Sequence, residues 1–250
     1  MKFLGSREAI AAVCVWAVAG VVGGVTSPAE AAPMVSTPTS DPLPGLGDEV
    51  ANARFRVHNQ GNWDMFLGDS GNPTGQPSTQ FADLGTTDDL SGVPFSLTLS
   101  YDANTEVLTF DVDSGGSGPG DTLTLDTSDG YDKIVIRPRV LPKEDNTYTI
   151  DLDNVDFSII GGGSVSFADN ELDVAAVGPG SDVDYGLIDG GQDLSLISWT
   201  LSADLVANVV TGTADPSERL RLDIFLVPEP VAATLLGLPL LLARRARRRC

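Results

Sequence analysis

The feature that most limits the fold of this chain is a two-residue alternation of apolar and polar side chains. Across residues 95–101 the order is Phe, Ser, Leu, Thr, Leu, Ser, Tyr, and across residues 108–112 it is Leu, Thr, Phe, Asp, Val. Because successive side chains of a β-strand point to opposite faces, each segment can bury one face against a core. Asp102-Ala103-Asn104 lies between the two segments and favours a turn, which predicts an antiparallel hairpin.

Other short segments with strand character fill most of the chain between its two ends. Glycine-rich turns separate several of them, for example Gly161-Gly162-Gly163 and Gly178-Pro179-Gly180. The glycine-rich stretch Gly115–Gly120 is predicted to be a hairpin loop, because it lacks the Gly-Lys-Ser/Thr ending of a phosphate-binding loop. Further strands are predicted at Arg54–His58, Thr122–Asp126, Lys133–Val140, Thr147–Ile159, Val165–Ala168, Leu172–Val177, Leu194–Ser202 and Arg219–Leu226.

No long apolar pattern with a period of 3.6 residues accompanies these strands. We therefore predict an all-β fold for residues 48–226, an antiparallel β-sandwich of jelly-roll-like type. An N-terminal signal helix and a short hydrophobic C-terminal helix are expected to flank it. Near Leu194–Leu201 the alternation slips by one residue, which predicts a β-bulge. Residues 32–47, rich in Pro, Ser and Thr, are predicted to form an extended spacer.

The N-terminus has the order of a secretory signal peptide. Lys2 and Arg7 precede the apolar run Ala9–Val25, and Ala29-Glu30-Ala31 offers a small-x-small cleavage site. We expect signal peptidase to recognise Ala29 and Ala31, to cut after Ala31 and so to remove residues 1–31. The protein is therefore predicted to be exported, with an uncleaved membrane anchor as the alternative.

The C-terminal segment 227–250 combines three elements. Pro228-Glu229-Pro230 is followed by the apolar run Val231–Ala243 and then by an arginine cluster. As a helix the thirteen-residue run reaches about 20 Å, which is short of the roughly 30 Å hydrocarbon core of a bilayer. The arginines are expected to stay on the cytoplasmic side. This order predicts transient insertion into the inner membrane, with a plain membrane anchor as the alternative.

The same three elements resemble the PEP-CTERM sorting signal of Gram-negative bacteria. In that family a membrane protease-transpeptidase, exosortase, recognises the tail and cuts near the motif. The resemblance implies an exosortase substrate at the cell surface or in the extracellular matrix, although Pro239 and the terminal Cys250 depart from the pattern. The recognition residues that it implies are Pro228, Glu229, Pro230, Arg244, Arg245, Arg247, Arg248 and Arg249.

The body of the chain is similar to the choice-of-anchor domains that precede such tails, in particular the W type. The similarity is carried by the residues of segment 94–102, by Leu108-Thr109-Phe110 and by Arg219-Leu220-Arg221-Leu222. Those domains have no established activity. The resemblance therefore implies a β-sandwich fold and a surface setting, without a reaction.

Net charge excludes one class of partner. The chain carries −20, and seven of its fifteen basic residues lie in the two terminal segments together with three of its thirty-five acidic residues. The part between them therefore carries about −24. So much negative charge repels a phosphate backbone, which argues against nucleic-acid binding. Both cysteines, Cys14 and Cys250, lie in the terminal segments, so no disulfide framework is expected.

Aspartates supply the best candidates for a metal site. Hard carboxylate oxygens suit Ca²⁺, and weak sites are useful where calcium is millimolar. The alternative is that these side chains are solvated carboxylates on strand faces and turns. Two aspartates separated by one residue occur at 111–113 and 151–153, and Asp182-Val183-Asp184 has the same spacing. The candidate ligands are Asp111, Asp113, Asp151, Asp153 and Asp156.

Catalytic patterns are scarce. His58 is the one histidine, expected as a polar residue of an edge strand, and no G-x-S-x-G sequence occurs. Trp199 is predicted to lie in the core, whereas Trp63 in Asn62-Trp63-Asp64 is a candidate for an exposed sugar platform. We expect a non-catalytic structural or adhesive protein associated with exopolysaccharide. A surface protein that binds or hydrolyses carbohydrate is the alternative.

Overall fold

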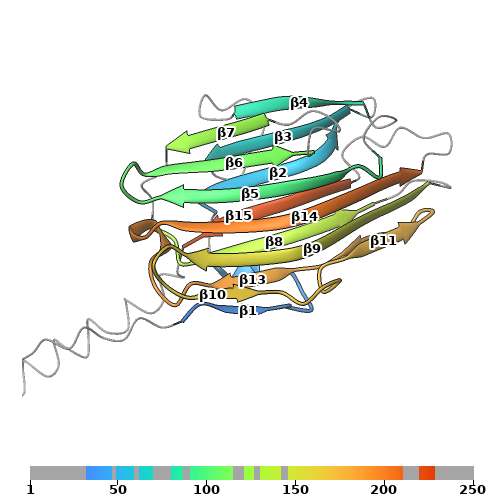
Figure 1. Ribbon diagram of the computed structural model, residues 1–250. Helices are drawn as coiled ribbons and strands as arrows, with labels where there is room; N and C mark the ends of the chain where they lie inside the picture. The colour runs from blue at the N-terminus through green and yellow to red at the C-terminus, as the bar shows by residue number, and fades with distance from the viewer. Residues whose placement is uncertain are drawn as a thin grey trace, which may run out of the picture. The chain divides into compact units, whose positions relative to one another are not determined.

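Two antiparallel β-sheets packed face to face form the fold in the computed structural model (Figure 1). The structure describes residues 32–46, 49–58, 62–69, 80–86, 91–114, 121–126, 130–141, 146–210 and 220–228. At some strand ends, including His58, it describes the backbone alone. The all-β prediction is confirmed. The two predicted terminal helices and the cleavage residues Ala29 and Ala31 lie outside the described residues.

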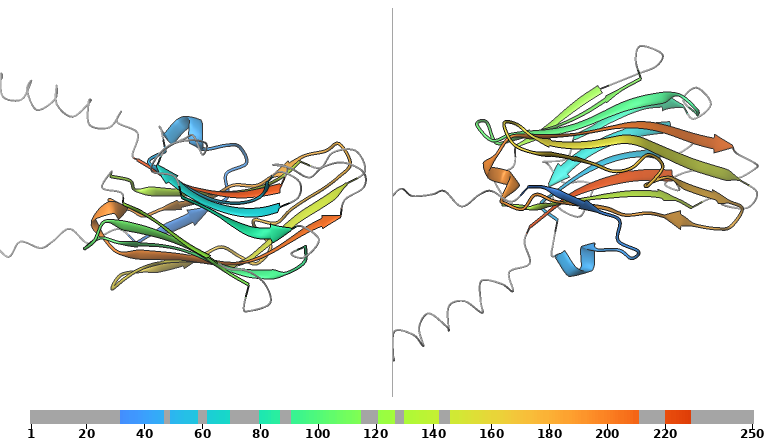
Figure 2. Two further views of the ribbon diagram at one scale, coloured as in Figure 1. Left: turned by 90° about the horizontal axis from the view of Figure 1, so that it is seen from above. Right: turned by 60° about the horizontal axis from the view of Figure 1, so that its bottom comes forward.

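Among the described residues, sheet A contains eight strands, and all their pairings are antiparallel. The short strand β12 (Asp182–Val183) pairs with the end of β8. Helix α1 (Leu43–Leu46) lies outside this sheet, as Figure 2 shows. The main order is β1 (Met34–Ser36), β13 (Gly186–Asp189), β8 (Lys133–Val140), β15 (Leu220–Val227), β2 (Ala51–His58), β3 (Asn62–Asp69) and β4 (Gln80–Thr86).

Sheet B contains seven strands in the described part of the chain, and they again pair antiparallel. Strand β11 (Val174–Val177) pairs with the first half of β9, and β10 pairs with its second half. A single-turn 3₁₀ helix, η2 (Leu194–Leu196), precedes β14. The main order is β10 (Ser164–Ser166), β9 (Thr147–Ile159), β14 (Trp199–Val210), β5 (Pro94–Asp102), β6 (Val107–Asp113) and β7 (Asp121–Asp126).

The predicted hairpin is confirmed, because β5 and β6 pair across the turn that begins after Asp102. Strands β8 and β9 have the bounds predicted for them. Pairing of β6 with β7 agrees with a hairpin connection through Gly115–Gly120, which itself lies outside the described residues. Strands β1, β3, β4, β12 and β13 were not predicted.

Two predicted boundaries need correction. The supposed spacer contributes β1, whose Met34–Ser36 pairs with Leu187–Asp189, so sheet A begins before residue 48. Val227 was assigned to the tail, but it is the last residue of β15, pairs with Lys133 and is fully buried. The fold therefore extends through Val227.

Aromatic rings fill the core where the two sheets meet. Trp199 is fully buried, as predicted, and its Nε1 donates to the Tyr131 hydroxyl at 3.1 Å. Tyr101 stacks on Trp199 with ring centroids 6.3 Å apart and donates its hydroxyl to the Ser195 carbonyl at 3.1 Å. Pairs of this kind add about 1 kcal/mol each to the burial of their surface.

The predicted bulge near Leu194–Leu201 is wrong. The slip in alternation arises because Leu194–Leu196 forms a 3₁₀ turn, capped by the Asp193 carboxylate, and β14 starts only at Trp199. A bulge does occur elsewhere: Ser202 pairs with Asp156 and Asp204 pairs with Asp153, so β9 carries one extra residue between the two pairs.

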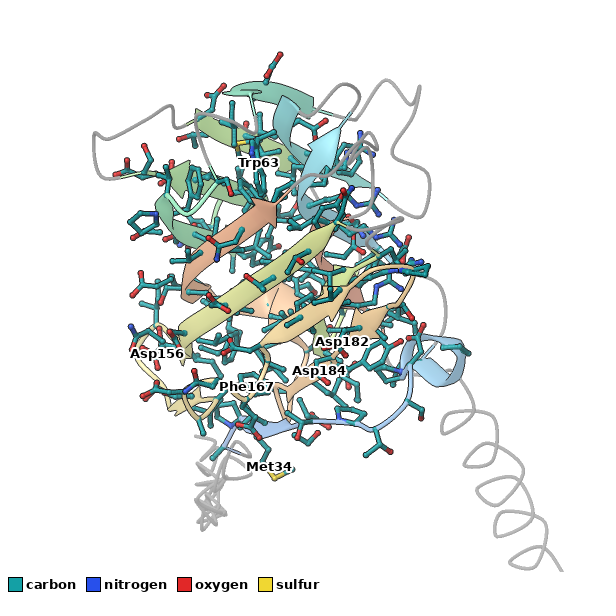
Figure 3. The ribbon with its side chains drawn as sticks, turned by 90° about the vertical axis from the view of Figure 1, so that its right-hand side faces the viewer. Met34, Trp63, Asp156, Phe167, Asp182 and Asp184 are labelled. Carbon is teal, nitrogen blue, oxygen red and sulfur yellow. The ribbon has the colours of Figure 1, made fainter. Side chains whose placement is uncertain are left out.

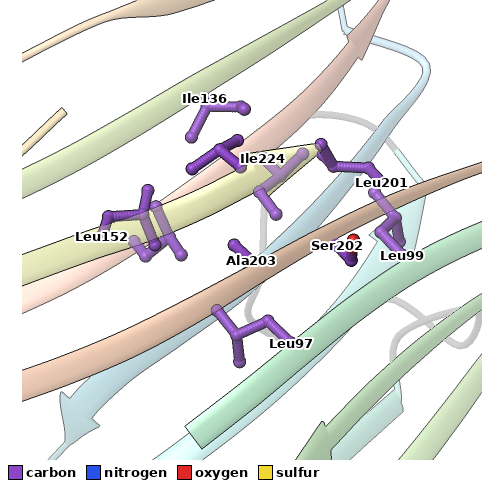
Figure 4. A pocket seen from close by; sticks show the side chains of 10 residues that line it. Leu97, Leu99, Ile136, Leu152, Leu201, Ser202, Ala203 and Ile224 are labelled. Carbon is purple, nitrogen blue, oxygen red and sulfur yellow. The ribbon is translucent and has the colours of Figure 1, made fainter. Parts of the chain in front are cut away.

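Asn154 supplies the backbone bend of this bulge. Its φ is +51°, in the left-handed region that asparagine tolerates better than most residues. Its side-chain Nδ2 donates to Asp204 Oδ2 at 2.8 Å across to β14. Beneath the bulge a void of about 10 Å³ is lined by apolar side chains including Leu152, Val155 and Ala203 (Figure 4). A void of this size and polarity stays dry.

We predict that Asn154→Val lowers the free energy of unfolding by about 1–2 kcal/mol, because a β-branched residue is strained at positive φ. Asn154→Gly is the matched control: it relieves the strain, loses one hydrogen bond, and should cost less. Urea denaturation of the two variants measures the difference. Equal stability of the Val and Gly variants would contradict a backbone role for Asn154.

Candidate functional site

The outer face of sheet B is a polar surface. Strand register places hydroxyl side chains opposite one another from β10 through to β7. The next row along the strands mixes hydroxyls with carboxylates. The first row consists of Ser164, Ser158, Thr200, Ser100, Thr109 and Thr124, and the second of Ser166, Asp156, Ser202, Thr98, Asp111 and Thr122.

The five predicted calcium ligands all lie on sheet B, but the fold does not bring them to one point. Asp111 and Asp113 are on β6, whereas Asp151, Asp153 and Asp156 are on β9. Strands β14 and β5 separate the two groups, which places them about 14 Å apart across the sheet. Asp111 accepts a hydrogen bond from the Thr122 hydroxyl, and Asp156 accepts one from the Ser166 hydroxyl.

Two of the predicted ligands, Asp151 and Asp153, belong with Asp182 and Asp184 to an acidic group around Asp173, at the side of the sandwich that carries β11 and β12. Burial, followed by the charges of Asp173 and Asp153, raises the pKa of Asp151 above its usual range. Burial, followed by the charges of Asp182 and Asp173, raises the pKa of Asp184. Figure 3 shows Asp182 and Asp184 close together and Asp156 apart from them.

Backbone amides hold part of this acidic group. Asp173 Oδ1 accepts from Leu152 N at 2.7 Å, and Asp182 Oδ2 accepts from Ala175 N at 2.9 Å. Among the residues that the structure describes, no group of three or more His, Cys, Asp or Glu side chains is arranged to hold a metal ion.

A depression of about 570 Å³ lies on the outer face of sheet B beside the turn between β5 and β6. Its lining offers the hydroxyls of Ser100, Thr109 and Thr200, and Ile160 beside them is 69% exposed. Asp102 is the one carboxylate among the lining residues described. This set can donate and accept hydrogen bonds to a hydroxylated ligand.

Asp102 is fixed as a carboxylate by its neighbours. Its Oδ1 accepts from the backbone N of Asn104 at 2.9 Å and from Asn104 Nδ2 at 3.0 Å. These hydrogen bonds, the backbone one first, lower the pKa of Asp102 below its usual range. A general acid needs a raised pKa, so Asp102 is a hydrogen-bond acceptor and is poorly suited to donate a proton at neutral pH.

Trp63 is not a sugar platform. It is fully buried, packs against Phe55 with ring centroids 5.0 Å apart, and points into the core together with Met65 and Leu67 (Figure 3). His58 lies at the end of β2, an interior strand between β15 and β3 and not an edge strand.

Charge of the opposite sign collects on the outer face of sheet A. All six lysines and arginines among the described residues lie there, on three adjacent strands. The sequence contains a signal for this cluster: outside the C-terminal arginines, Arg-x-Arg occurs in three separate segments, at 54–56, 137–139 and 219–221. The six are Arg54, Arg56, Lys133, Arg137, Arg139 and Arg221.

Asp223 of β15 is the centre of this face and is fully buried. It accepts from Arg54 of β2 through one oxygen, and from Arg137 of β8 through the other, with Arg137 Nη2 at 2.8 Å. Arg221 Nε lies 3.2 Å from the same oxygen. Burial opposes ionisation of Asp223, but Arg54, Arg221 and Arg137 outweigh it and hold the pKa of this carboxyl below its usual 3.8.

The predicted tail starts where β15 ends. Pro228 follows the buried Val227 directly and lines a depression of about 360 Å³ together with Gly130, Tyr131, Asp132 and Asp193. The remaining sorting residues, Glu229, Pro230 and the five arginines, lie outside the described residues. Within the described ranges, no helix has the length and hydropathy needed to cross a membrane.

Comparison of the chain with protein-family models finds no match, and comparison with curated proteins finds none either.

We predict that Asp223→Asn destabilises the chain by about 3–5 kcal/mol, because buried guanidinium groups lose their shared counter-charge. The wild-type protein should keep this contribution at neutral pH and lose it only as pH falls below 3.8, since the pKa in the folded state is the lower one. Urea denaturation at pH 7 and pH 3 measures both effects. Asp169→Asn in an exposed turn is the matched control; an equal loss in both variants would contradict the role of Asp223.

Proposed function

We propose that this chain is an exported bacterial surface protein, sorted by exosortase, whose β-sandwich has a structural or adhesive role and no catalytic one. It is cut by signal peptidase after Ala31 and inserted transiently in the inner membrane by its tail. It is then displayed at the cell surface or released into exopolysaccharide. A jelly-roll-like connectivity, the signal helix and the short hydrophobic helix belong to the same proposal.

The observation that supports sorting most directly is the junction between the fold and the tail. Val227 is the last paired residue of β15, and Pro228 is the next residue along the chain. A protease acting near Pro228-Glu229-Pro230 therefore cuts directly after the last strand described. Removal of the tail leaves every described strand of both sheets in place.

The polar face of sheet B supports a role in a hydrated matrix. Its rows of hydroxyls and carboxylates keep the face solvated and offer hydrogen bonds to polysaccharide. The single carboxylate in the neighbouring depression supports a non-catalytic reading, because glycoside hydrolysis commonly uses two carboxyl groups. The same depression favours the alternative, a surface carbohydrate-binding protein, since hydroxyls and Asn104 line it beside the exposed Ile160.

Truncation after Pro228 tests the sorting proposal. We expect the truncated protein to leave the cell envelope and to appear in the medium, with an unchanged melting temperature because no strand is lost. Replacing Glu229 and Pro230 by Ala in the full chain should instead leave the uncut protein in the inner membrane. Fractionation with immunoblotting measures both, and a wild-type distribution of either variant would contradict sorting through this motif.

Calcium binding is the second testable part of the proposal. A bound cation would offset the mutual repulsion that contributes to the raised pKa values of Asp151 and Asp184, so calcium should raise the melting temperature and a chelator should reverse the rise. Asp151→Asn should weaken the response, whereas Asp111→Asn, three strands away, should keep it. A melting temperature that calcium and chelator leave unchanged would remove calcium from the proposal.

A further inference from the structure

Three arginines form a row across sheet A, one from each of three adjacent strands. Strand register pairs Arg221 of β15 with Arg56 of β2 on one side and with Arg139 of β8 on the other. Neighbouring strands lie about 4.8 Å apart, so the three side chains leave the same face side by side. Like charges at this spacing repel one another unless counter-charges or a ligand compensate them.

The described carboxylates do not balance this face. Asp41, Asp64 and Asp223 are the carboxylates that form ion pairs with its arginines, against five guanidinium groups. The pKa of Arg221 lies below its usual value, and burial is the largest cause. Asp223 raises this pKa, whereas the charges of the neighbouring arginines 54, 137 and 139 lower it. Counting the described residues alone, five arginines against three carboxylates leave an excess of about two positive charges, in a part of the chain whose total charge is about −24.

Two members of the row are only partly compensated by the contacts described. Arg221 Nε is near Asp223 Oδ2, but its N–H is buried and finds no hydrogen-bond acceptor. Arg54 and Arg137 already take up both oxygens of Asp223. Arg139, at the end of the row, forms no ion pair among the contacts described and is partly exposed. A buried charged donor without an acceptor is costly, so the described residues compensate the guanidinium group of Arg221 only in part.

We propose that Arg139 and Arg221 form a binding site for the carboxylate groups of an acidic polysaccharide. Each guanidinium presents a planar fork that matches a carboxylate with two parallel hydrogen bonds. Two forks on adjacent strands bind two carboxylates of one polymer. That the carboxylates belong to a polymer rests on the proposed matrix-associated function. The excess of guanidinium donors is independent of that function.

A second copy of the chain, docking the carboxylates of its sheet B here, fits less well. Helix α1 stands on the outer face of sheet A, where Leu43 and Leu46 pack against Phe225, Val135 and Val227 (Figure 2). Asp41, just before this helix, reaches within 3.7 Å of Arg137 Nη1. A flat sheet cannot lie on a face that carries this helix, but a narrow polymer chain can pass beside it.

Calorimetric titration of the full-length chain with polygalacturonate tests the site, with neutral galactan as the uncharged probe. We expect binding of polygalacturonate alone, weakened about tenfold (about 1.4 kcal/mol) in Arg139→Gln, since this variant loses a charge-assisted hydrogen bond. Arg139→Lys should recover only part of the affinity, because a lysine lacks the planar fork. Lys133→Gln, six residues earlier on the same face and paired with Asp132, is the matched control and should bind like the wild type.

Equal affinity of wild type and Arg139→Gln would overturn the proposal, as would equal binding of both polymers or an equal loss in Lys133→Gln. The remaining alternative is that the arginine row is a contact between two copies of the chain, and sedimentation without added polymer tests it. Self-association that Arg139→Gln abolishes would assign the row to a contact between copies and also overturn the proposal. Galacturonate monomer that saturates the site and displaces the polymer would support a carboxylate site and limit it to one sugar unit at a time. Failed sorting of the truncated chain would leave each of these results intact.

Discussion

Asp223 connects the three strands on which sheet A depends. It lies on β15, and it is bonded to Arg54 of β2 and Arg137 of β8, the strands on either side. A buried carboxylate is tolerated only where such partners satisfy it, and each arginine in turn rests its flat side near a ring, Arg137 at 4.6 Å from the centre of Phe225. The interaction therefore specifies which strands are neighbours as well as their register, since a shift by one residue would move the carboxylate to the inner face.

The same arrangement separates charge between the two sides of the sandwich. Inner faces of both sheets are apolar, so every polar residue of a strand must leave on an outer face. On sheet A these positions are occupied by arginines with a few carboxylates, and on sheet B by hydroxyls with many carboxylates and no basic residue in the described strands. An acidic chain thus carries carboxylates and hydroxyls on one outer face and guanidinium groups on the other.

Local alternation is sufficient to predict most long strands, because it depends on residues that are close in sequence. It fails where burial is decided by distant segments. Trp63 has polar neighbours in sequence and suggested an exposed ring, yet Met65 and Leu67 continue its inward face. Strand β13 begins at Gly186, which has no side chain and so adds nothing to the alternation. Glycine is needed there because a Cβ would meet the Phe167 ring at 2.9 Å. The acidic group around Asp173 and the arginine row both depend on sheet order, which no alternation encodes.

The position of β15 has a mechanical consequence. Its C-terminal end continues into the segment from which the protein would be attached, and β8 and β2 flank it along nearly its whole length. Tension applied through that end is directed along the strand axis, so the hydrogen bonds of two ladders are loaded together in shear and not opened one after another. Attachment through an edge strand such as β1, with three paired residues, would let the sheet peel under the same force. Under the proposed sorting, tension would therefore enter the fold through a strand that is paired on both sides and not through an edge strand.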